Sequence, residues 1–134
     1  MPDDFTFRLS PPVSNEALTE LWAAAWDYHK PVDFSPVLVR SLVYVCAYLD
    51  ERLVGFVNVC GDGDMHAFIL DTTVHPDVQR RGLGTQLVRR AAEAARERGA
   101  YWLHVDYESH LDAFYKGCGF QPTLAGLMNL DDDL

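Results

Sequence analysis

The most informative segment of the sequence is Val74-His75-Pro76-Asp77-Val78-Gln79-Arg80-Arg81-Gly82-Leu83-Gly84-Thr85, which joins an apolar run to a long helical pattern. The first N–H groups of a helix have no partner within the helix, and the helix dipole places partial positive charge at that end. Two glycines remove side chains that would block a ligand, and Arg80 and Arg81 add full positive charge. The segment therefore predicts a loop that binds a phosphate or pyrophosphate.

Two other phosphate-binding patterns fit this segment less well. A Walker A loop needs Gly-Lys-Ser/Thr, which does not occur in the sequence. The dinucleotide fingerprint finds its first half in Gly82-Leu83-Gly84 and an acidic residue at about the right distance in Asp106. However, its third glycine position is Leu87, and the turn after Val74 is too long. A dinucleotide-binding domain is therefore disfavoured.

Apolar periodicity on both sides of the segment predicts a mixed α/β fold. Side-chain patterns predict strands at 5–9, 43–49, 53–60, 66–74 and 101–105, and two short final strands at 120–124 and 127–130. Helical spacing predicts a helix capped by Ser14 or Asn15, a second at 37–42, a long helix between Gly82 and Gly99, and a short one at 112–116. The unit at 66–105 should be a parallel crossover, and the strands before it should be antiparallel. The 101–105 strand is expected to be buried.

Length and composition restrict the class of protein. The 134 residues, of which 49% are hydrophobic, predict one domain over 1–134 with a substantial core. No apolar run approaches the roughly 20 residues of a membrane span, and the acidic start is unlike a signal peptide. Three cysteines without CxxC spacing argue against a disulfide framework or a metal site, and the apolar runs around Cys46 and Cys60 favour buried, reduced thiols there. We therefore expect a cytoplasmic protein that binds no membrane and no metal.

Charge is distributed unevenly along the chain. The net charge of −9 disfavours nucleic-acid partners. The segment from Gln79 to Arg98 nevertheless holds six arginines and two glutamates, and the remainder of the chain is strongly acidic. A local basic segment of this kind suits a small anionic ligand, and it equally suits an ordinary charged helix face.

At this point the sequence resembles a known family. Gln79-Arg80-Arg81-Gly82-Leu83-Gly84 matches the Q/R-x-x-G-x-G/A acetyl-CoA signature of the GNAT superfamily of N-acetyltransferases. The turn at 50–55, the approach at 74–76 and the element Phe114-Tyr115-Lys116-Gly117-Cys118-Gly119-Phe120 are similar to that family in order and spacing. The resemblance implies a central mixed, largely antiparallel sheet with helices on both faces, in which the parallel strands at 66–74 and 101–105 splay apart. It also implies acetyl-CoA as the cosubstrate.

The resemblance further implies how the coenzyme is held. The main chain of Thr72 and Val74 should bind pantetheine, and the pyrophosphate should be held by the amides of Gln79, Arg80, Arg81, Gly82, Leu83, Gly84 and Thr85. Tyr115 matches the tyrosine that faces the sulfur, where a protonated phenol can give a proton to a leaving thiolate. Many members carry Asn-x-x-Ala before this tyrosine. Here Glu108 and Leu111 stand at those positions, so the contact of that asparagine is not carried over.

Acetyl transfer to an amine requires a group that takes the proton of the ammonium form. The candidates are Asp71, Asp106, Glu108 and His75, or a water that they hold. Asp71 lies in an otherwise apolar strand, where a carboxylate needs a reason to be buried. Asp106 and Glu108 follow the splayed strand and share one side of the chain at a period of two. His75 precedes Pro76 and has an alternative interpretation as a loop residue.

The acceptor should lie between the N-terminal helical region and the final strands. The aromatic candidates there are Trp22, Trp26, Tyr28, His29 and Phe34, with acidic neighbours at Asp27, Asp33 and Glu108. Such a site would suit a cationic amine. We expect an N-acetyltransferase that acts on a primary amine of a small molecule or peptide by direct transfer in a ternary complex, without a cysteine nucleophile. The alternatives are a non-catalytic acyl-CoA-binding or regulatory module and an interaction protein that has lost the ligand. Many members are dimers, so a homodimer is also implied.

Overall fold

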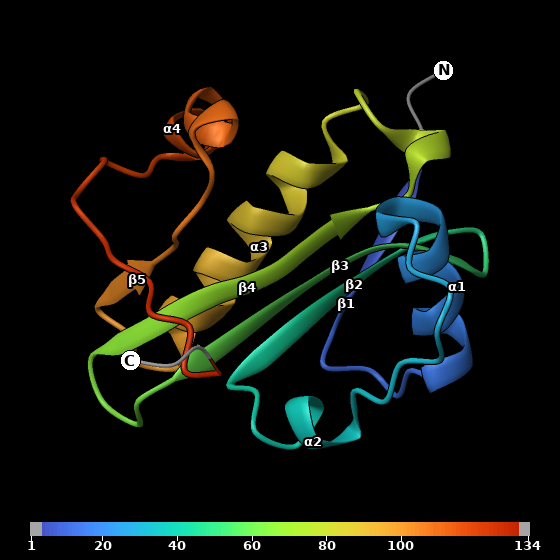
Figure 1. The fold of residues 1–134 in the computed structure, drawn as a ribbon, viewed down its shortest axis with the longest axis horizontal. Helices are drawn as coiled ribbons and strands as arrows, with labels where there is room; N and C mark the ends of the chain where they lie inside the picture. Colours follow the sequence, from blue (N-terminus) through green and yellow to red (C-terminus); the bar gives the residue numbers. More distant parts are fainter. Residues whose placement is uncertain (1–3, 132–134) are drawn as a thin grey trace.

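The computed structural model describes residues 4–131, which form one sheet with helices on both faces (Figure 1). The five strands lie side by side in sequence order, and only the last pair is parallel. They are β1 (Phe5–Leu9), β2 (Val43–Leu49), β3 (Arg52–Gly61), β4 (His66–Val74) and β5 (Trp102–His104). This arrangement confirms the predicted mixed, largely antiparallel sheet.

Helices cover the two faces unequally. α3 (Leu83–Glu97) lies behind the sheet in Figure 1, and α1 (Asn15–Trp26) and the short α2 (Ser35–Leu38) lie on the other face. The remaining helical pieces are η1 (Pro76–Val78), η2 (Ser109–Leu111) and α4 (Asp112–Cys118). α1 begins where predicted, because the Ser14 side chain accepts a hydrogen bond from the Ala17 N–H at 3.1 Å.

The larger core lies between α3 and the sheet. Alternate residues of β2, β3 and β4 point toward α3, as the period of two in a strand requires. They meet an apolar stripe of the helix that consists of Leu83, Leu87, Ala91, Ala94 and Ala95. Gly55 permits a close approach there, because an added Cβ would lie 2.8 Å from Leu87 Cδ1. α3 is therefore held in one position, and so is the loop at its N-terminus.

A second, aromatic core lies beneath α1 and α2. Leu18 and Leu21 are fully buried against Phe56 of β3. The Trp22 ring packs edge-on against Phe34 and Phe56, with centroid distances of 4.8 Å and 5.8 Å. Part of the predicted aromatic group therefore forms core, and the rest stays at the surface.

Several elements differ from prediction. The 101–105 strand is shorter and not buried, because β5 is an edge strand; Trp102 is 54% exposed. The helix expected at 37–42 occupies Ser35–Leu38. Of the three free cysteines only Cys46 is buried, whereas Cys60 and Cys118 are half-buried. Among residues 4–131, no helix is long and apolar enough to cross a membrane.

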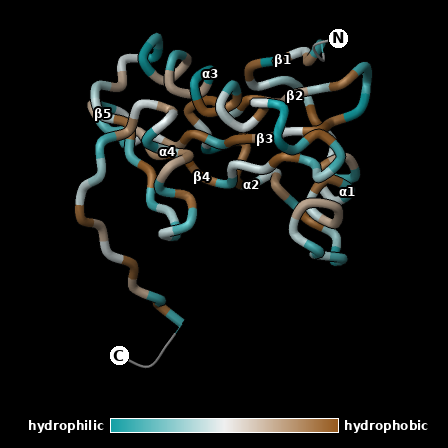
Figure 2. The backbone as a smooth tube through the Cα atoms, turned by 90° about the horizontal axis from the view of Figure 1, so that it is seen from above, coloured by the Kyte–Doolittle hydropathy of each residue, from teal (hydrophilic) through white to brown (hydrophobic). Residues whose placement is uncertain are grey.

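The two final strands predicted at 120–124 and 127–130 do not form. Residues 121–131 are exposed, and the chain runs away from the body of the domain after α4 (Figure 2). An alternating pattern gives a segment the capacity to be a strand. A strand exists only where a neighbour takes up its backbone hydrogen bonds, and the sheet provides none to this segment.

Candidate active site at the junction of β4 and α3

The loop between β4 and α3 presents a row of unpaired backbone N–H groups. Within the described residues, the N–H groups of Gly82, Leu83, Gly84 and Thr85 donate to no acceptor of the protein, and the helix ladder begins with Gln86 N–H bonded to Gly82 O at 3.1 Å. Gly82 caps the helix with φ of 79°, a left-handed conformation that glycine adopts without strain. These donors and the helix dipole form a cradle suited to a phosphate-type anion.

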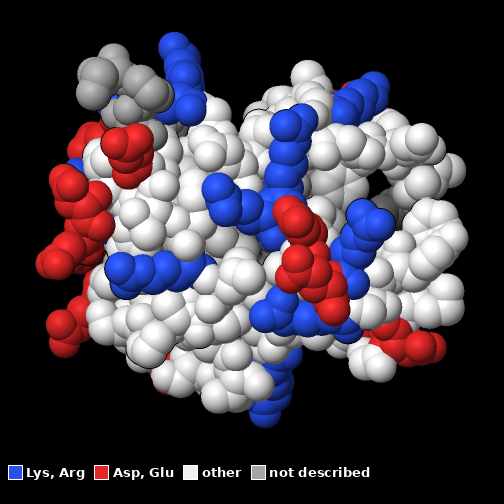
Figure 3. Space-filling view, turned by 180° about the vertical axis from the view of Figure 1, so that it is seen from behind, with Lys and Arg blue, Asp and Glu red and all other residues white. Residues whose placement is uncertain are grey.

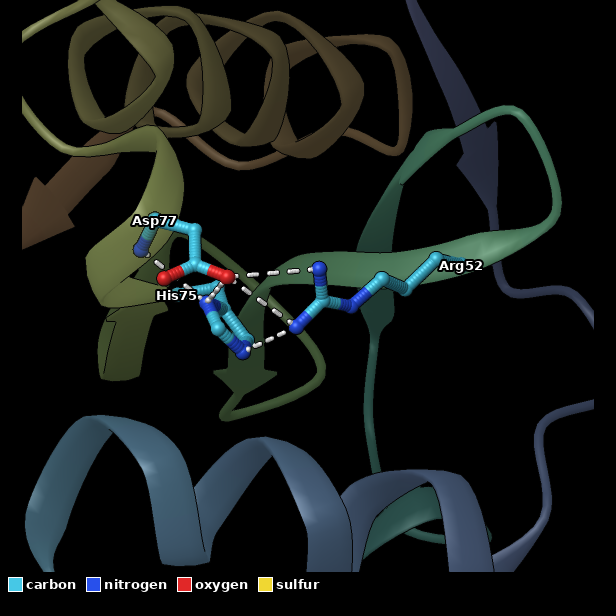
Figure 4. Close-up of polar contacts among 3 residues, drawn as sticks. All are labelled: Arg52, His75 and Asp77. Carbon is cyan, nitrogen blue, oxygen red and sulfur yellow. Dashed lines mark hydrogen bonds and ion pairs between the residues drawn. The ribbon is translucent and has the colours of Figure 1, made fainter.

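Arg52, His75 and Asp77 fix the start of this loop (Figure 4). The His75 Nδ1 accepts a hydrogen bond from the Asp77 N–H at 3.1 Å. The Arg52 Nη2 lies 2.7 Å from His75 Nε2 and 3.4 Å from Asp77 Oδ2. Both ring nitrogens of His75 are thus engaged in holding the loop. This geometry supports the interpretation of His75 as a loop residue and not as a base.

β4 contains a bulge immediately before the loop. The register with β3 shifts between Phe56 and Asn58, and Asp71 adopts a left-handed φ of 58°. The Thr73 Oγ1 donates to Asp71 O at 3.0 Å and accepts from the Trp26 indole N–H at 3.1 Å. These two bonds tie the bulge to the last turn of α1. Neither Thr73 nor its bond to Trp26 was predicted, because two residues 47 positions apart carry no local signal.

The parallel pair splays apart beyond the start of β4. β5 pairs with β4 only from His66 to Phe68, so within the described chain no strand lies beside β4 from Ile69 to Val74 on that edge. This open edge includes Thr72 and Val74, the two predicted pantetheine contacts. An unpaired strand edge can accept an extended polar group by strand-like hydrogen bonding. The predicted splay is therefore confirmed.

α4 places Tyr115 beside this open edge. Tyr115 is buried, its ring stacks on Tyr107 with centroids 4.8 Å apart, and Phe120 packs edge-on at 5.8 Å. The neighbouring Phe114 covers the helix start, since a Cβ at Gly84 would lie 3.2 Å from its ring. α4 and the cradle are thus packed together, which the spacing of the sequence alone did not show.

The electrostatic environment keeps Tyr115 protonated at neutral pH. Burial raises the pKa of its phenol, and Asp106 and Cys118 act in the same direction, whereas interaction with the Thr72 hydroxyl lowers it. Thr72 Oγ1 is itself buried and has no hydrogen-bond partner of good geometry. A buried polar atom without a partner marks a place where a ligand can complete the hydrogen bonding.

The three candidate carboxylates lie in different surroundings. Desolvation by the surrounding protein raises the pKa of Asp71 in the bulge, although the residue retains solvent contact. Asp106 is exposed but near enough to Tyr115 to influence its pKa. Glu108 points to the surface, where its Oε2 lies 3.5 Å from His110 Nδ1. The structure thus brings Asp106 near Tyr115, places Asp71 in the bulge of β4 next to Thr72, and leaves Glu108 in solvent.

An open hollow of about 460 Å³ lies beside α1 and α2. Its walls include Trp22, Trp26, Tyr28 and Phe34, with one carboxylate from Asp33. Four of the five aromatic candidates therefore gather here. The fifth, His29, instead contacts Asp27 at the surface, with 2.5 Å between His29 Nε2 and Asp27 Oδ1. Trp26 joins this hollow to the bulge through its bond to Thr73.

Two arginines of α3, Arg89 and Arg90, make contacts along the helix surface and not at the anion cradle. Seen from the α3 side, basic and acidic side chains alternate across this face (Figure 3). Arg90 lies over the Phe7 ring at 4.0 Å, and Arg89 donates to Gly117 O at 3.2 Å. For these two residues the charged-helix-face interpretation holds.

The family of the chain follows from this fold and from a direct match. Residues 13–120 match the acetyltransferase (GNAT) family, and the chain belongs to it. A solved GNAT family acetyltransferase from Streptococcus pneumoniae TIGR4 has a TM-score of 0.76 at 26% identity, covering 95% of this chain and 99% of that one.

Relatives with assigned names are similar to this chain over part of their length. Glucosamine 6-phosphate N-acetyltransferase 1 of Oryza sativa subsp. japonica is 33% identical over 114 residues, 83% of this chain and 66% of the rice protein. Mycothiol acetyltransferase of Mycolicibacterium vanbaalenii is 32% identical over 65 residues, 48% of this chain and 22% of its own. The chain thus spans less than two thirds of these relatives.

Proposed function

We propose that the protein is an acetyl-CoA-dependent N-acetyltransferase that acts on a primary amine of a small molecule or peptide by direct transfer in a ternary complex. The observation that carries the proposal is the meeting of three features where β4, α3 and α4 come together: the unpaired amides at the start of α3, the open edge of β4 and the buried Tyr115 phenol. The free cysteines are compatible with a cytoplasmic location, which we also propose.

The residues present fit acetyl-CoA, which supplies an acetyl group activated as a thioester. The amides from Gly82 through Thr85 would hold the pyrophosphate, with Gly82 and Gly84 leaving room for its approach. The Gln79 amide, which was also predicted to bind it, instead donates to Pro76 O at 3.3 Å. The main chain of Thr72 and Val74 would pair with the pantetheine arm. Thr72 Oγ1, buried and without a hydrogen-bond partner, is the polar atom that such an arm would satisfy.

Tyr115 is the proposed proton donor. Its raised pKa keeps the phenol protonated well above neutral pH, so the hydroxyl can supply a proton to a departing thiolate. Its position beside Thr72 puts that proton at the open edge of β4. Cys118 takes no part as a nucleophile, because burial raises the pKa of its thiol and disfavours the reactive thiolate.

Asp71 is the proposed base, directly or through a water molecule. A carboxylate with a raised pKa is a better proton acceptor at neutral pH than one fully in water. The bulge holds Asp71 in a left-handed conformation at the point where β4 opens. Asp106 is the second candidate because it lies near enough to Tyr115 to raise the pKa of that phenol. Glu108 is the weakest of the three, since it faces solvent.

The aromatic hollow is the proposed acceptor site. Its aromatic side chains and Asp33 suit a positively charged or amphipathic amine, since a cation gains from both ring faces and a carboxylate. Among the described residues that line it, none is lysine or arginine. A phosphorylated amino sugar, the acceptor named for the rice relative, would therefore lack a counter-charge in this hollow.

The experiment is a thiol-release assay with acetyl-CoA and a panel of polyamines, aminoglycosides, amino acids, peptides and glucosamine 6-phosphate. Turnover of cationic acceptors is expected, and release with neutral or anionic acceptors alone would contradict the acceptor assignment. Coenzyme binding without thiol release for any amine would favour the non-catalytic acyl-CoA module. Tyr115→Phe should lower kcat by about 10²-fold or more with little change in coenzyme affinity. Equal activity of that variant at every pH would remove Tyr115 from the mechanism.

A further inference from the structure

The bulge of β4 places two residues opposite one. Asp71 and Thr72 together face the single residue Val57 of β3, because the pairs on either side match one to one. When the first residue of a bulge is left-handed, it is usually glycine. Here it is Asp71, with φ of 58°. An aspartate adopts this conformation more readily than most residues but still at a cost, so contacts from its surroundings must hold it there.

Thr73 supplies one such contact from within the strand. Its hydroxyl donates to Asp71 O at 3.0 Å and so fixes the carbonyl of the left-handed residue. Thr73 is only 1% exposed, so solvent does not compete for this bond. A buried bond of this kind is costly to lose, because water cannot replace it. The hydroxyl of Thr73 therefore restricts the backbone of Asp71.

Trp26 supplies a second contact from outside the strand. Its indole N–H, which can only donate, donates to Thr73 Oγ1 at 3.1 Å. The Thr73 hydroxyl has a single proton, already directed to Asp71 O, so the order of the bonds is fixed as indole to hydroxyl to carbonyl. A hydroxyl that accepts one hydrogen bond donates a stronger one. These two bonds, called the Trp26–Thr73 link below, therefore reinforce each other.

The position of Trp26 is set by α1. The helix ends at this residue, because Asp27 turns to a left-handed φ of 52°. Leu18 and Leu21 hold the helix in the aromatic core, where both are fully buried. α1 thus stands beside the end of β4 (Figure 1), and the ring of its last residue reaches the bulge. The Trp26–Thr73 link therefore joins a helix and a strand that are both fixed by packing.

The Trp26 ring also has an exposed side. Trp26 is 56% exposed and lines the hollow of about 460 Å³ beside α1 and α2. Its ring is therefore accessible to a molecule in the hollow, whereas its N–H is committed to Thr73. One side chain thus connects the proposed acceptor site with the backbone of the proposed base, Asp71.

We propose that Trp26 and Thr73 are positioning residues, which hold the carboxylate of Asp71 at a fixed place relative to an amine bound in the hollow. This inference rests on the proposed function, because it takes Asp71 as the base and the hollow as the acceptor site. The two parts of Trp26 have separate tasks: the ring contacts the acceptor, and the N–H holds the bulge. A small displacement of a catalytic group lowers the rate strongly, so loss of the N–H should slow turnover without weakening acceptor binding.

Two substitutions of Trp26 separate these tasks in the thiol-release assay, with the amine of the panel that has the highest kcat/KM. Trp26→Phe keeps an aromatic ring and removes the N–H, so kcat should fall about tenfold or more while the acceptor KM changes little. Trp26→Leu removes the aromatic ring as well, so the acceptor KM should also rise. A Trp26→Phe variant with the native kcat would overturn the proposal.

Thr73 is tested by rescue and by non-additivity. Thr73→Val keeps the shape of the side chain and loses both bonds, so its kcat should fall as in Trp26→Phe. Thr73→Ser keeps the hydroxyl and should have a kcat close to the native value. The double variant Trp26→Phe/Thr73→Val should be no slower than Thr73→Val alone, because both residues act through one chain of bonds. Equal defects in the Ser and Val variants, or additive defects in the double variant, would contradict the link.

Tyr44→Phe is the matched control. The Tyr44 hydroxyl donates to Pro11 O, a bond that also ties the chain near α1 to the sheet, but before the start of the helix. If the Trp26–Thr73 link only stabilised the packing of α1, loss of the Tyr44 bond would slow turnover as well. We expect the kcat of Tyr44→Phe to match the native value. A decrease as large as that of Thr73→Val would be decisive against a positioning role.

Hydrogen exchange of the indole N–H groups, followed by NMR, tests the link without turnover. The Trp26 signal is assigned by its absence from Trp26→Phe. In the native chain it should exchange more slowly than that of Trp102, which is 54% exposed, and at least about tenfold faster in Thr73→Val than in the native chain. Fast exchange in a native chain that releases thiol would reject the link alone. Slow exchange without thiol release for any amine would reject the proposed function, and the positioning role with it.

Discussion

Gly82 offers a quantitative test of the anion cradle, because the cost of placing a side chain there is confined to the backbone. Its φ is 79°, and an added Cβ would meet nothing within 4 Å. Gly82→Ala therefore introduces no clash, only the strain of a left-handed alanine, about 1–2 kcal/mol. If the loop keeps its conformation, the free energy of unfolding falls by this amount.

The strained loop can also relax, and then the cost appears in binding. If the substituted residue turns to negative φ, the N–H groups of the cradle move away from the pyrophosphate. Acetyl-CoA must then restore the native loop, and its Kd rises by up to about 5–30-fold, which is the same 1–2 kcal/mol. The decrease in the free energy of unfolding and the decrease in the free energy of CoA binding should therefore add up to the strain energy of the left-handed alanine, however that energy is divided between them.

Chemical denaturation of the free protein and calorimetry with CoA measure the two parts. Gly117→Ala is the matched control, because Gly117 also has open space but lies within α4. A helical glycine replaced by alanine should stabilise the protein, by about 0.5–1 kcal/mol, with no effect on CoA affinity. If Gly82→Ala changes neither the free energy of unfolding nor the CoA affinity beyond experimental error, the loop does not need a left-handed residue at this position. The assignment of the loop as an anion-binding cradle would then be wrong.

Three further outcomes are expected. Gly55→Ala should destabilise the fold by about 1–3 kcal/mol in chemical denaturation, because its Cβ would lie 2.8 Å from Leu87 Cδ1; an unchanged midpoint would show that α3 is loosely packed. Partial desolvation raises the folded-state pKa of Asp71, so its charge destabilises the fold at neutral pH and this penalty disappears as pH falls through that pKa. Asp71→Asn should raise Tm at neutral pH only and lower kcat; a parallel loss of both would contradict its role as base. Burial raises the pKa of Cys46 to about 12, so iodoacetamide should modify it last of the three thiols, as mass spectrometry can follow.

The sequence predicted correctly those structural features whose cause lies within a single helix, strand or loop. The Ser14 cap, the strand patterns at 43–49 and 66–74, and the two glycines before α3 each express a local physical preference, and the structure confirms these elements. The glycine at Gly82 is the clearest case, since a left-handed cap favours that residue alone.

Contacts between segments far apart in the sequence could not be predicted in this way. The bond from Trp26 to Thr73, the cover of Gly84 by Phe114, and the clamp of Arg52 on His75 each join residues far apart in the chain. No periodicity connects such residues, because they meet only after the sheet has formed.

The two strands predicted near the C-terminus show most directly this difference between what local patterns predict and what tertiary contacts allow. The alternation in residues 120–130 indicates a capacity for strand pairing, but no strand of the described chain pairs with that segment. The sequence alone was enough for the order of the elements up to α4, the glycine-containing loop before α3 and the family resemblance, because each depends on short-range spacing. Only the tertiary structure decided the surroundings of Tyr115 and Asp71 and the absence of a strand partner for residues 121–131, because burial and pairing are properties of segments brought together by folding.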